Sequence, residues 1–314
     1  MQLPVNSNAT TEAKKLLAYL CEVAGNGIIS GQHTQTIPME EIEYIKEKTN
    51  REPKLRGFEL LAYSPNINFD DANEACLTEV YENENTLEQA LKFAKETDGI
   101  ITFTFHWFSP LGGRDKSFYT ENTDFDPANV LLEGTPERDA FYSDMREIAQ
   151  KLQVFKDEKI PILWRPFHES EGTWFWWASK GPEIAGELYK LMYHEFVDVY
   201  HLDNLLWVWN CPLTEGYPGD EYVDVVSLDV YLPEYKPTDY MEEYEKLISA
   251  TSDKKVAALA EIGYLPDADM MAKSKVPFAY FMVWSKEFCI GDEKNTCDNL
   301  KKTYDNSYVI KLGD

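Results

Sequence analysis

The hydrophobic and polar positions of the chain follow a repeated two-part rhythm. Short runs rich in β-branched and aromatic residues end in polar or aromatic side chains, and amphipathic segments with helical spacing separate them. Eight such runs are expected as strands: residues 27–33, 55–61, 100–107, 161–169, 204–210, 223–231, 256–263 and 278–284. Eight strands that alternate with helices predict an α/β fold of the (β/α)8 TIM barrel type.

The segments between these runs have the spacing of amphipathic helices. A T-x-x-Q capping box is expected to start the second of them at Thr86. Residues 11–25 precede the first run and are expected to close the bottom of the barrel, whereas 63–85 and 108–134 are expected as loops over one face. The helices between the runs are predicted at residues 38–49, 86–97, 135–158, 181–201 and 239–250, and only a single turn fits after the fifth run.

The alternative architecture is a doubly wound sheet. Such a sheet usually has fewer strands, and its glycine-rich first turn is absent here. No linker rich in proline, glycine or serine divides the chain. The pattern therefore predicts a single domain that covers residues 1–314.

Charge and cysteine content narrow the range of partners. The chain has 30 basic and 55 acidic residues, a net charge of −25, which repels nucleic acid and anionic membranes and disfavours polyanionic substrates such as pectate. The simplest reading of this acidity is solubility. Five cysteines without a C-x-x-C motif argue against a disulfide framework, although Cys289 and Cys297 could bridge locally. We expect no nucleic-acid or membrane partner and a monomeric protein.

The first residues show no targeting signal. No apolar run reaches the roughly 18 residues of a membrane span, and MQLPVNSNATTEAKK lacks a charged-then-apolar signal. We expect a secreted protein whose signal peptide is not part of this sequence, or a cytoplasmic one if its substrate is an oligosaccharide.

The ends of the expected strands carry chemistry. In such a barrel the active site lies at the carboxyl ends of the strands. Glu169 and Glu261 stand out there, because each ends an apolar strand and the fourth and seventh strand ends face each other. Two opposed carboxyls, one protonated and one ionised, are what glycoside hydrolysis needs. The strand ends together present His33, Glu59, His106, Trp107, His168, Glu169, Asn210, Asp229, Tyr231, Glu261 and Trp284.

The stretch WRPFHESEGTWFWW gathers aromatic rings around one of these carboxyls. Trp174, Trp176 and Trp177 offer flat apolar faces to the C–H faces of a sugar, although Trp176 and Trp177 are as readily core residues. Core positions are expected for Trp164 and for at least one of Trp207 and Trp209.

Several motifs together resemble a known family. They are ISGQH, FHW, WRPFHE followed by an aromatic-rich loop, YPGDEYVDVVSLDVY, ALAEIG and FMVW. This set is similar to glycoside hydrolase family 26, the β-mannanase family among the (β/α)8 retaining glycosidases. The resemblance covers about residues 28–285.

The resemblance implies roles for individual residues. Glu169 would be the acid/base and Glu261 the nucleophile. His168 would orient the nucleophile and the adjacent sugar, and Tyr231 would hydrogen-bond the nucleophile, with Asp229 nearby. The implied mechanism retains configuration through a glycosyl-enzyme intermediate, which requires carboxyls ~5–5.5 Å apart.

The remaining implied roles concern the surroundings of the two carboxyls. Trp174 and Trp284 would line the subsites that flank the scissile bond, and His106 and Trp107 would serve the glycone side. Arg165 would lie beneath the site and hold the carboxylates ionised.

The expected activity is that of an endo-β-1,4-mannanase acting on mannan, glucomannan or galactomannan polysaccharides or oligosaccharides. One alternative is a β-1,3-1,4-glucanase or β-1,3-xylanase on the same scaffold. Another is a catalytically inactive sugar-binding protein, against which the presence of both carboxyls with His168 and Tyr231 speaks.

No cofactor or metal is expected. The H-E-x-x-H motif is absent because residue 172 is glycine, and the glycine-rich nucleotide motifs and G-x-S-x-G are missing. Two strand-end residues stay open at this point. His33 could be structural, and Glu59 could support the site or pair with Arg56 or Arg114.

Overall fold

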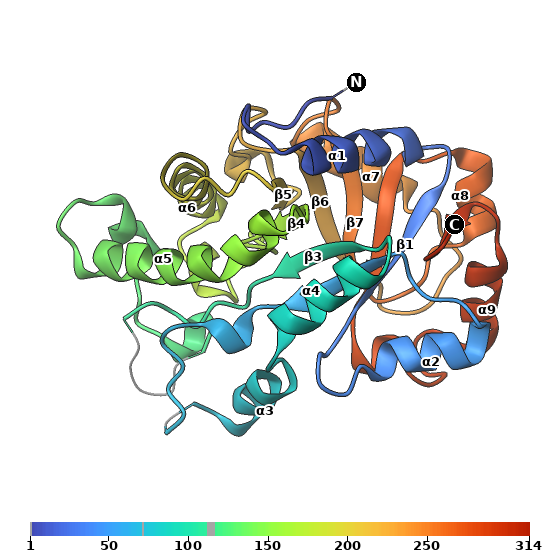
Figure 1. Cartoon of the computed structure of the whole chain (residues 1–314), viewed down its shortest axis with the longest axis horizontal. Helices are drawn as coiled ribbons and strands as arrows, with labels where there is room; N and C mark the ends of the chain where they lie inside the picture. Colours follow the sequence, from blue (N-terminus) through green and yellow to red (C-terminus); the bar gives the residue numbers. More distant parts are fainter. Residues whose placement is uncertain (1, 71, 112–116) are drawn as a thin grey trace.

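Eight parallel strands form a closed barrel in the computed structural model, which describes residues 2–70, 72–111 and 117–314 (Figure 1). Each strand pairs with the next, and β1 pairs with both β8 and β2 to close the ring. The strands are β1 (Ile28–His33), β2 (Leu55–Glu59), β3 (Ile100–Thr104), β4 (Ile162–Arg165), β5 (Leu205–Asn210), β6 (Val225–Val230), β7 (Val256–Ile262) and β8 (Phe278–Val283). Each lies within one of the eight predicted runs, so the predicted (β/α)8 barrel is confirmed.

Helices surround the barrel and connect its strands (Figure 1). They are α1 (Thr11–Val23), α2 (Glu40–Thr49), α3 (Glu74–Glu82), α4 (Thr86–Glu96), α5 (Pro136–Asp157), α6 (Pro182–His194), α7 (Met241–Ala250), α8 (Ala268–Ser274) and α9 (Cys297–Asp305). A two-residue strand, β9 (Val309–Ile310), adds to β1. After β5 the chain forms only a single turn at Thr214–Gly216, as predicted.

Three helices and one cap differ from the prediction. Helix α3 interrupts the segment 63–85 that was expected as a loop, and α8 and α9 were not foreseen. They are short, and α3 buries only Cys76 and Val80, so its apolar periodicity is weak. The expected cap at Thr86 is wrong: Asn85 precedes α4 in a left-handed conformation, and the Thr86 hydroxyl donates to the carbonyl of Asn83.

The amino-terminal end of the barrel is filled with apolar side chains. Leu16, Leu17 and Leu20 of α1 belong to the same buried cluster as inward-facing strand residues such as Ile29 and Leu163. Helix α1 therefore closes this end, as predicted. The outward side of β4 and β5 packs on helices instead: Trp164, Trp207 and Trp209 are fully buried.

Positions that point into the barrel become polar toward the carboxyl ends of the strands. In β4 the inward positions run from Leu163 to Arg165, and in β6 from Val225 to Asp229. In β7 the register slips between Leu259 and Glu261, so that Glu261 pairs with Asp229 of β6. A bulge of this kind re-aims a side chain, and here it brings Glu261 to the mouth of the barrel beside Asp229.

Candidate active site

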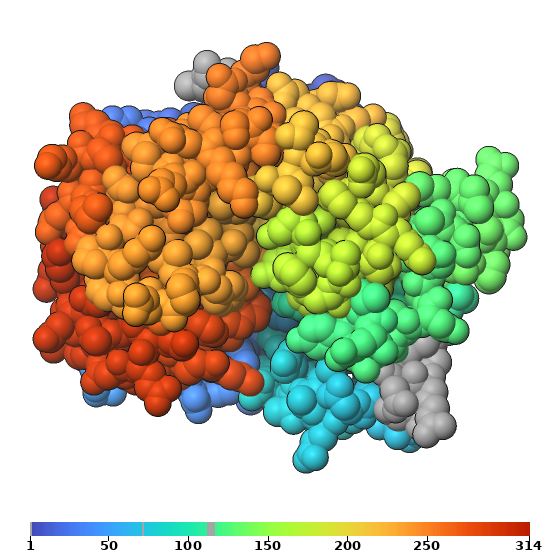
Figure 2. Space-filling view, turned by 180° about the vertical axis from the view of Figure 1, so that it is seen from behind, coloured from blue at the N-terminus to red at the C-terminus, as the bar shows by residue number. Residues whose placement is uncertain are grey.

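Three carboxyl groups converge at the carboxyl ends of the strands. One carboxylate oxygen each of Glu169, Asp229 and Glu261 lies within 4.8 Å of the other two. The segments that follow β2, β3, β4, β6 and β8 meet around a hollow on the surface, seen as cyan, green, yellow-green, gold and red in Figure 2. The two predicted glutamates therefore lie together, although 92 residues separate them in the sequence.

Arg165 carries the positive charge beneath this cluster. It is fully buried, and its guanidinium donates at 2.7 Å to Asp229 and at 2.7 Å to Glu261, with a third hydrogen bond to the hydroxyl of Thr104. Burial disfavours the charge, but Asp229 and Glu261 outweigh it and raise the pKa of Arg165. The guanidinium thus remains charged and balances the carboxylates.

Glu261 receives two hydrogen bonds that favour its ionised form. Arg165 binds Oε2, and the hydroxyl of Tyr231 donates to Oε1 at 2.5 Å. Burial and the neighbouring Asp229 raise the pKa of Glu261, and Arg165 and Tyr231 act in the opposite direction. Both oxygens are therefore held in place by donors on β4 and on the segment after β6.

Glu169 has different surroundings. Its backbone N–H donates to Oδ1 of Asn210, and the indole N–H of Trp174 donates to its Oε2 at 2.7 Å. Burial, followed by the charge of Asp229, raises the pKa of Glu169 to about 7. A carboxyl with such a pKa can hold a proton at neutral pH and release it, as a general acid must.

The backbone around Glu169 is strained. Phe167 and Glu169 both adopt left-handed conformations, with φ of 51° and 53°. For residues other than glycine such a conformation costs on the order of 1–3 kcal/mol. The hydrogen bond from Glu169 N–H to Asn210, at 2.8 Å, helps to hold this turn, which directs the acidic side chain into the mouth.

Two histidines and Glu59 form a chain along one side of the mouth. Glu59 accepts from the backbone N–H of His106 and contacts its Nδ1 at 2.7 Å. Nε2 of His106 lies 3.1 Å from Nε2 of His168. Glu59 thus supports the site, whereas Arg56 pairs with Glu52 and Arg114 lies outside the described residues.

His168 is more deeply placed than predicted. It is 1% exposed and makes its side-chain hydrogen bond to His106, not to Glu261. The ring of His33 is also buried and stacks on Trp284, with ring centroids 4.0 Å apart. His33 therefore supports Trp284, which is half-buried at the end of β8.

The aromatic side chains divide into exposed and buried groups. Trp174 and Tyr231 are 46% and 42% exposed and can meet a sugar. Trp107 and Trp177 do not line the mouth, and their predicted contact with substrate is corrected here. Trp107 is 1% exposed and donates its N–H to Asp144, and Trp177 is fully buried and donates to the carbonyl of His168. They support the mouth from behind.

Sequence reasoning left Asn210 and Thr104 without roles. Asn210 bonds both the backbone of Glu169 and the carboxyl of Asp229, at 2.8 Å each, and so links the fourth and sixth strands. Thr104 accepts from Arg165. Their positions could have indicated a role at the site, because Thr104 and Asn210 are the inward-facing residues at the ends of β3 and β5, respectively.

The close approach of three carboxyls raises the question of a cation. Carboxylate oxygens are ligands for hard cations. Here the singly charged guanidinium of Arg165 already donates to one oxygen each of Asp229 and Glu261, at 2.7 Å in both cases. The expected absence of a metal stays a prediction.

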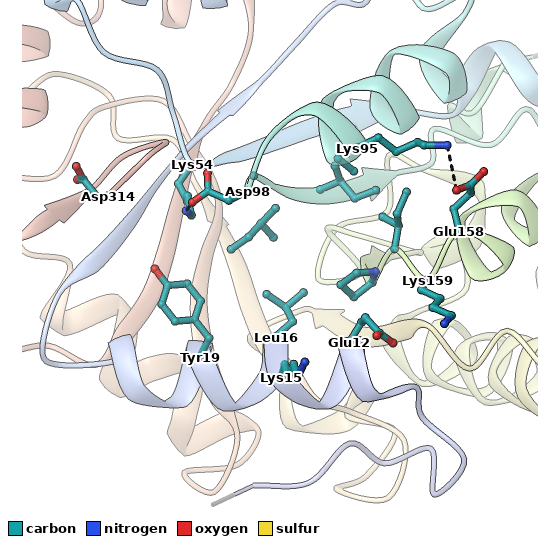
Figure 3. A pocket seen from close by; sticks show the side chains of 16 residues that line it. Glu12, Lys15, Leu16, Tyr19, Lys54, Lys95, Asp98, Glu158, Lys159 and Asp314 are labelled. Carbon is teal, nitrogen blue, oxygen red and sulfur yellow. Dashed lines mark hydrogen bonds and ion pairs between the residues drawn. The ribbon is translucent and has the colours of Figure 1, made fainter.

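A cavity of about 860 Å³ lies at the opposite, amino-terminal end of the barrel (Figure 3). Residues of α1 and the segments before β3 and β4 line it. Its charged residues include pairs such as Lys54 with Asp98, and Lys95 with Glu158 at 3.0 Å. The three clustered carboxyls lie at the other end, so this cavity is not the candidate active site.

Among the helices of the described residues, none combines the length and the apolar composition that a membrane-spanning segment requires.

Comparison with known proteins gives a consistent result. Residues 5–314 match the family model of glycosyl hydrolase family 26. A mannan endo-1,4-beta-mannosidase of Thermothelomyces thermophilus is 35% identical over 98% of this chain and 62% of its own length. A similar enzyme of Bacillus subtilis is 24% identical over 99% of the chain. The chain spans only 50% and 52% of two Piromyces mannan endo-1,4-beta-mannosidases.

Solved structures show the same architecture. The GH26-CBM35 β-(1,4)-mannanase of Podospora anserina superposes with a TM-score of 0.86 at 35% identity, over 98% of this chain and 67% of that one. A β-mannanase from a symbiotic protist of the termite Reticulitermes speratus, complexed with gluco-manno-oligosaccharide, gives 0.85 at 28% identity, over 98% and 96%. With a family match that covers nearly its full length, the chain belongs to glycosyl hydrolase family 26.

Proposed function

We propose that this chain is a retaining endo-β-1,4-mannanase that hydrolyses mannan, glucomannan or galactomannan. The observation that carries the proposal is the approach of Glu169 and Glu261 to within 4.8 Å at the mouth of the barrel. Retaining glycosidases place their carboxyls about 5–5.5 Å apart, whereas inverting ones leave room for a water between them. The mannanase names of the relatives favour β-mannan as substrate.

In this proposal Glu261 is the nucleophile and Glu169 the acid/base. Glu169 gives its proton to the leaving glycosidic oxygen while Glu261 attacks the anomeric carbon to form a glycosyl-enzyme ester. Glu169, now ionised, then takes a proton from water, which displaces Glu261 with overall retention. The hydrogen bonds to Glu261 from Arg165 and Tyr231 support this assignment, since they favour a charged nucleophile.

The surrounding residues are proposed to bind the sugar. Trp174, Tyr231 and Trp284 present aromatic surface to it. His106, whose two ring nitrogens contact Glu59 and His168, is proposed to meet the sugar through the edge of its ring. Asp229 and Arg165 hold the carboxyls in place. We also propose one domain over residues 1–314 that acts as a monomer. Secretion follows if the substrate is a polysaccharide, because a polymer does not enter a cell.

The role assignment is tested with a substrate whose leaving group needs no proton. Glu169→Ala should lose activity on mannan by about 10²–10⁴-fold, yet form the glycosyl-enzyme rapidly from a dinitrophenyl glycoside. Glu261→Ala should be inactive on both. If the two variants were equally inactive on the dinitrophenyl glycoside, the roles would be wrongly assigned.

The substrate class is tested by product release from glucomannan, galactomannan, mixed-linkage barley glucan and β-1,3-xylan, with Glu261→Ala as the blank. Short manno-oligosaccharides from the first two, absent in the blank, are expected. Release only from barley glucan or xylan would overturn the choice of mannan while retaining the two glutamates. Sugar binding without any product would indicate an inactive binding protein.

A further inference from the structure

The indole of Trp174 makes a polar contact with the carboxyl of Glu169. Its N–H donates to Oε2 at 2.7 Å, and no other described side chain donates to this carboxyl. A carboxyl oxygen that accepts a short hydrogen bond from a fixed donor is a poor site for a proton, because the hydroxyl oxygen of a protonated carboxyl is a weaker acceptor than its carbonyl oxygen. Oε1 is therefore the oxygen that is left to carry the proton of Glu169.

Gly172 makes this contact possible. A Cβ added at residue 172 would lie 1.9–2.3 Å from three carbons in the six-membered ring of Trp174. The ring thus occupies the space that any side chain at this position would need. The turn between the two residues is tied to Glu169 itself, because Gly172 N–H donates to the carbonyl of Glu169 at 3.1 Å.

The segment after β3 holds the backbone of Trp174 from the other side. Thr120 donates through its backbone N–H to the carbonyl of Trp174 at 2.7 Å, and through its hydroxyl to that of Thr173 at 2.8 Å. Tyr119 and Phe175 form an antiparallel bridge next to it. The ring remains 46% exposed although its backbone is anchored, so it is held firmly at the edge of the mouth.

We propose that Trp174, seated on Gly172, is a positioning residue that fixes the orientation of the Glu169 carboxyl and leaves Oε1 as the proton-bearing oxygen. This inference rests on the proposed role of Glu169 as acid/base. Trp174 would then orient Glu169 in addition to any stacking on a sugar. Gly172 would be required because a side chain at this position would displace the indole of Trp174.

The contact also affects the titration of Glu169. Burial and Asp229 raise the pKa of Glu169, and the hydrogen bond from Trp174 lowers it because it stabilises the carboxylate. Without the indole N–H the pKa should therefore be higher. The titratable and charged groups that face Glu169 are Asp229, Glu171, Arg165, Glu261, Tyr231 and Tyr119.

The test uses Trp174→Phe, which keeps an aromatic ring and removes the N–H. The basic limb of the pH profile of kcat/KM on mannan should move upward by about one unit, because the variant lacks a donor that stabilises the ionised carboxyl of Glu169. At the optimum, kcat should fall more than KM rises. Gly172→Ala should shift the limb likewise and also raise KM, since the displaced ring no longer meets the sugar.

Trp284→Phe is the matched control. It alters another tryptophan of the mouth that has no hydrogen bond to Glu169, and whatever its activity, its basic limb should stay at the wild-type position. An unchanged limb in Trp174→Phe, with a wild-type enzyme that cleaves mannan, would overturn the positioning role.

A second readout does not need activity. The carboxyl ¹³C resonance of Glu169, assigned by comparison with Glu169→Gln, should titrate at higher pH in Trp174→Phe than in the wild type. Equal midpoints would overturn the inference even if mannan were not the substrate. Failure to cleave any mannan, with a shifted midpoint, would instead contradict only the proposed function.

Discussion

The two ends of the barrel use the same inward-facing strand positions in opposite ways. At the amino-terminal end, residues such as Ile29 and Leu163 pack with Leu17 and Leu20 of α1 into an apolar cluster. Two positions further along β4, Leu163 gives way to Arg165, whose charge is matched by carboxylates from other strands.

This contrast separates the source of stability from the source of chemistry. The closed end buries apolar surface, which stabilises the fold at roughly 25 cal/mol per Å². The open end buries charges, which costs free energy that the hydrogen bonds only partly offset. The raised pKa of Glu169 is a sign of that cost. Substitutions at the open end should therefore lower activity with little change in stability, whereas substitutions at the closed end should lower stability with little change in activity.

The largest effect is expected for Glu261→Ala at the open end. Loss of the nucleophile should lower kcat on mannan on the order of 10⁴-fold or more. The midpoint of thermal unfolding should change little, because the lost hydrogen bonds are offset by removal of a buried charge. Parallel measurements of kcat and thermal unfolding check this, and a large loss of stability would contradict the proposed division.

Arg165→Met should be the exception at the open end. It leaves Asp229 and Glu261 buried beside one another without their common cation. Breaking a buried ion pair on one side costs about 3–5 kcal/mol. We expect lower stability together with lost activity, measured by denaturant unfolding at pH 7. Wild-type stability would show that Arg165 serves catalysis alone.

Leu17→Ala tests the closed end. Leu17 is fully buried in the cluster beneath the barrel. Large-to-small changes of this kind destabilise by about 2–5 kcal/mol. Activity per folded molecule at low temperature should stay at the wild-type level, because the three carboxyls lie at the other end. A changed pH profile would show that the two ends are coupled.

A small effect on stability, which depends on pH, is expected for Glu169→Gln. Because burial raises the pKa of Glu169 to about 7 from its ordinary 4.5, the folded protein binds a proton there more tightly than the unfolded chain does. Stability contributed by this proton is present below pH 4.5 and is lost as pH rises through about 7. The variant lacks this loss, so its melting temperature should exceed that of the wild type at pH 8 but not at pH 4. An equal difference in melting temperature between variant and wild type at pH 4 and at pH 8 would contradict the raised pKa of Glu169.

The fold was readable from the sequence because the barrel strands are continuous apolar runs with clear polar ends. Weakly periodic elements were not readable. Helix α3 buries two residues only, and β9 has two residues. The cap of α4 was misread because Thr86 is the first helical residue and not the residue before it.

At the site, strand ends indicated which residues meet but not how each side chain points. Side chains alternate between the two faces of a strand, so Trp107 lies on the side opposite His106. The sequence therefore already indicated that Trp107 points away from the mouth of the barrel. Trp177 could not be placed that way, because it follows a turn with two left-handed residues that breaks any periodicity. The bulge before Glu261 and the contact between Trp174 and Glu169 depend on tertiary packing, which a single sequence does not show.

The most direct test of the central claim is the stereochemistry of hydrolysis. Proton NMR would follow the anomeric signals of the products released from a manno-oligosaccharide in the first minutes of reaction. Two carboxyls within 4.8 Å of each other predict that the β-anomer appears first and that the α-anomer forms only later by mutarotation. Initial release of the α-anomer would contradict the double displacement and the role of Glu261 as nucleophile.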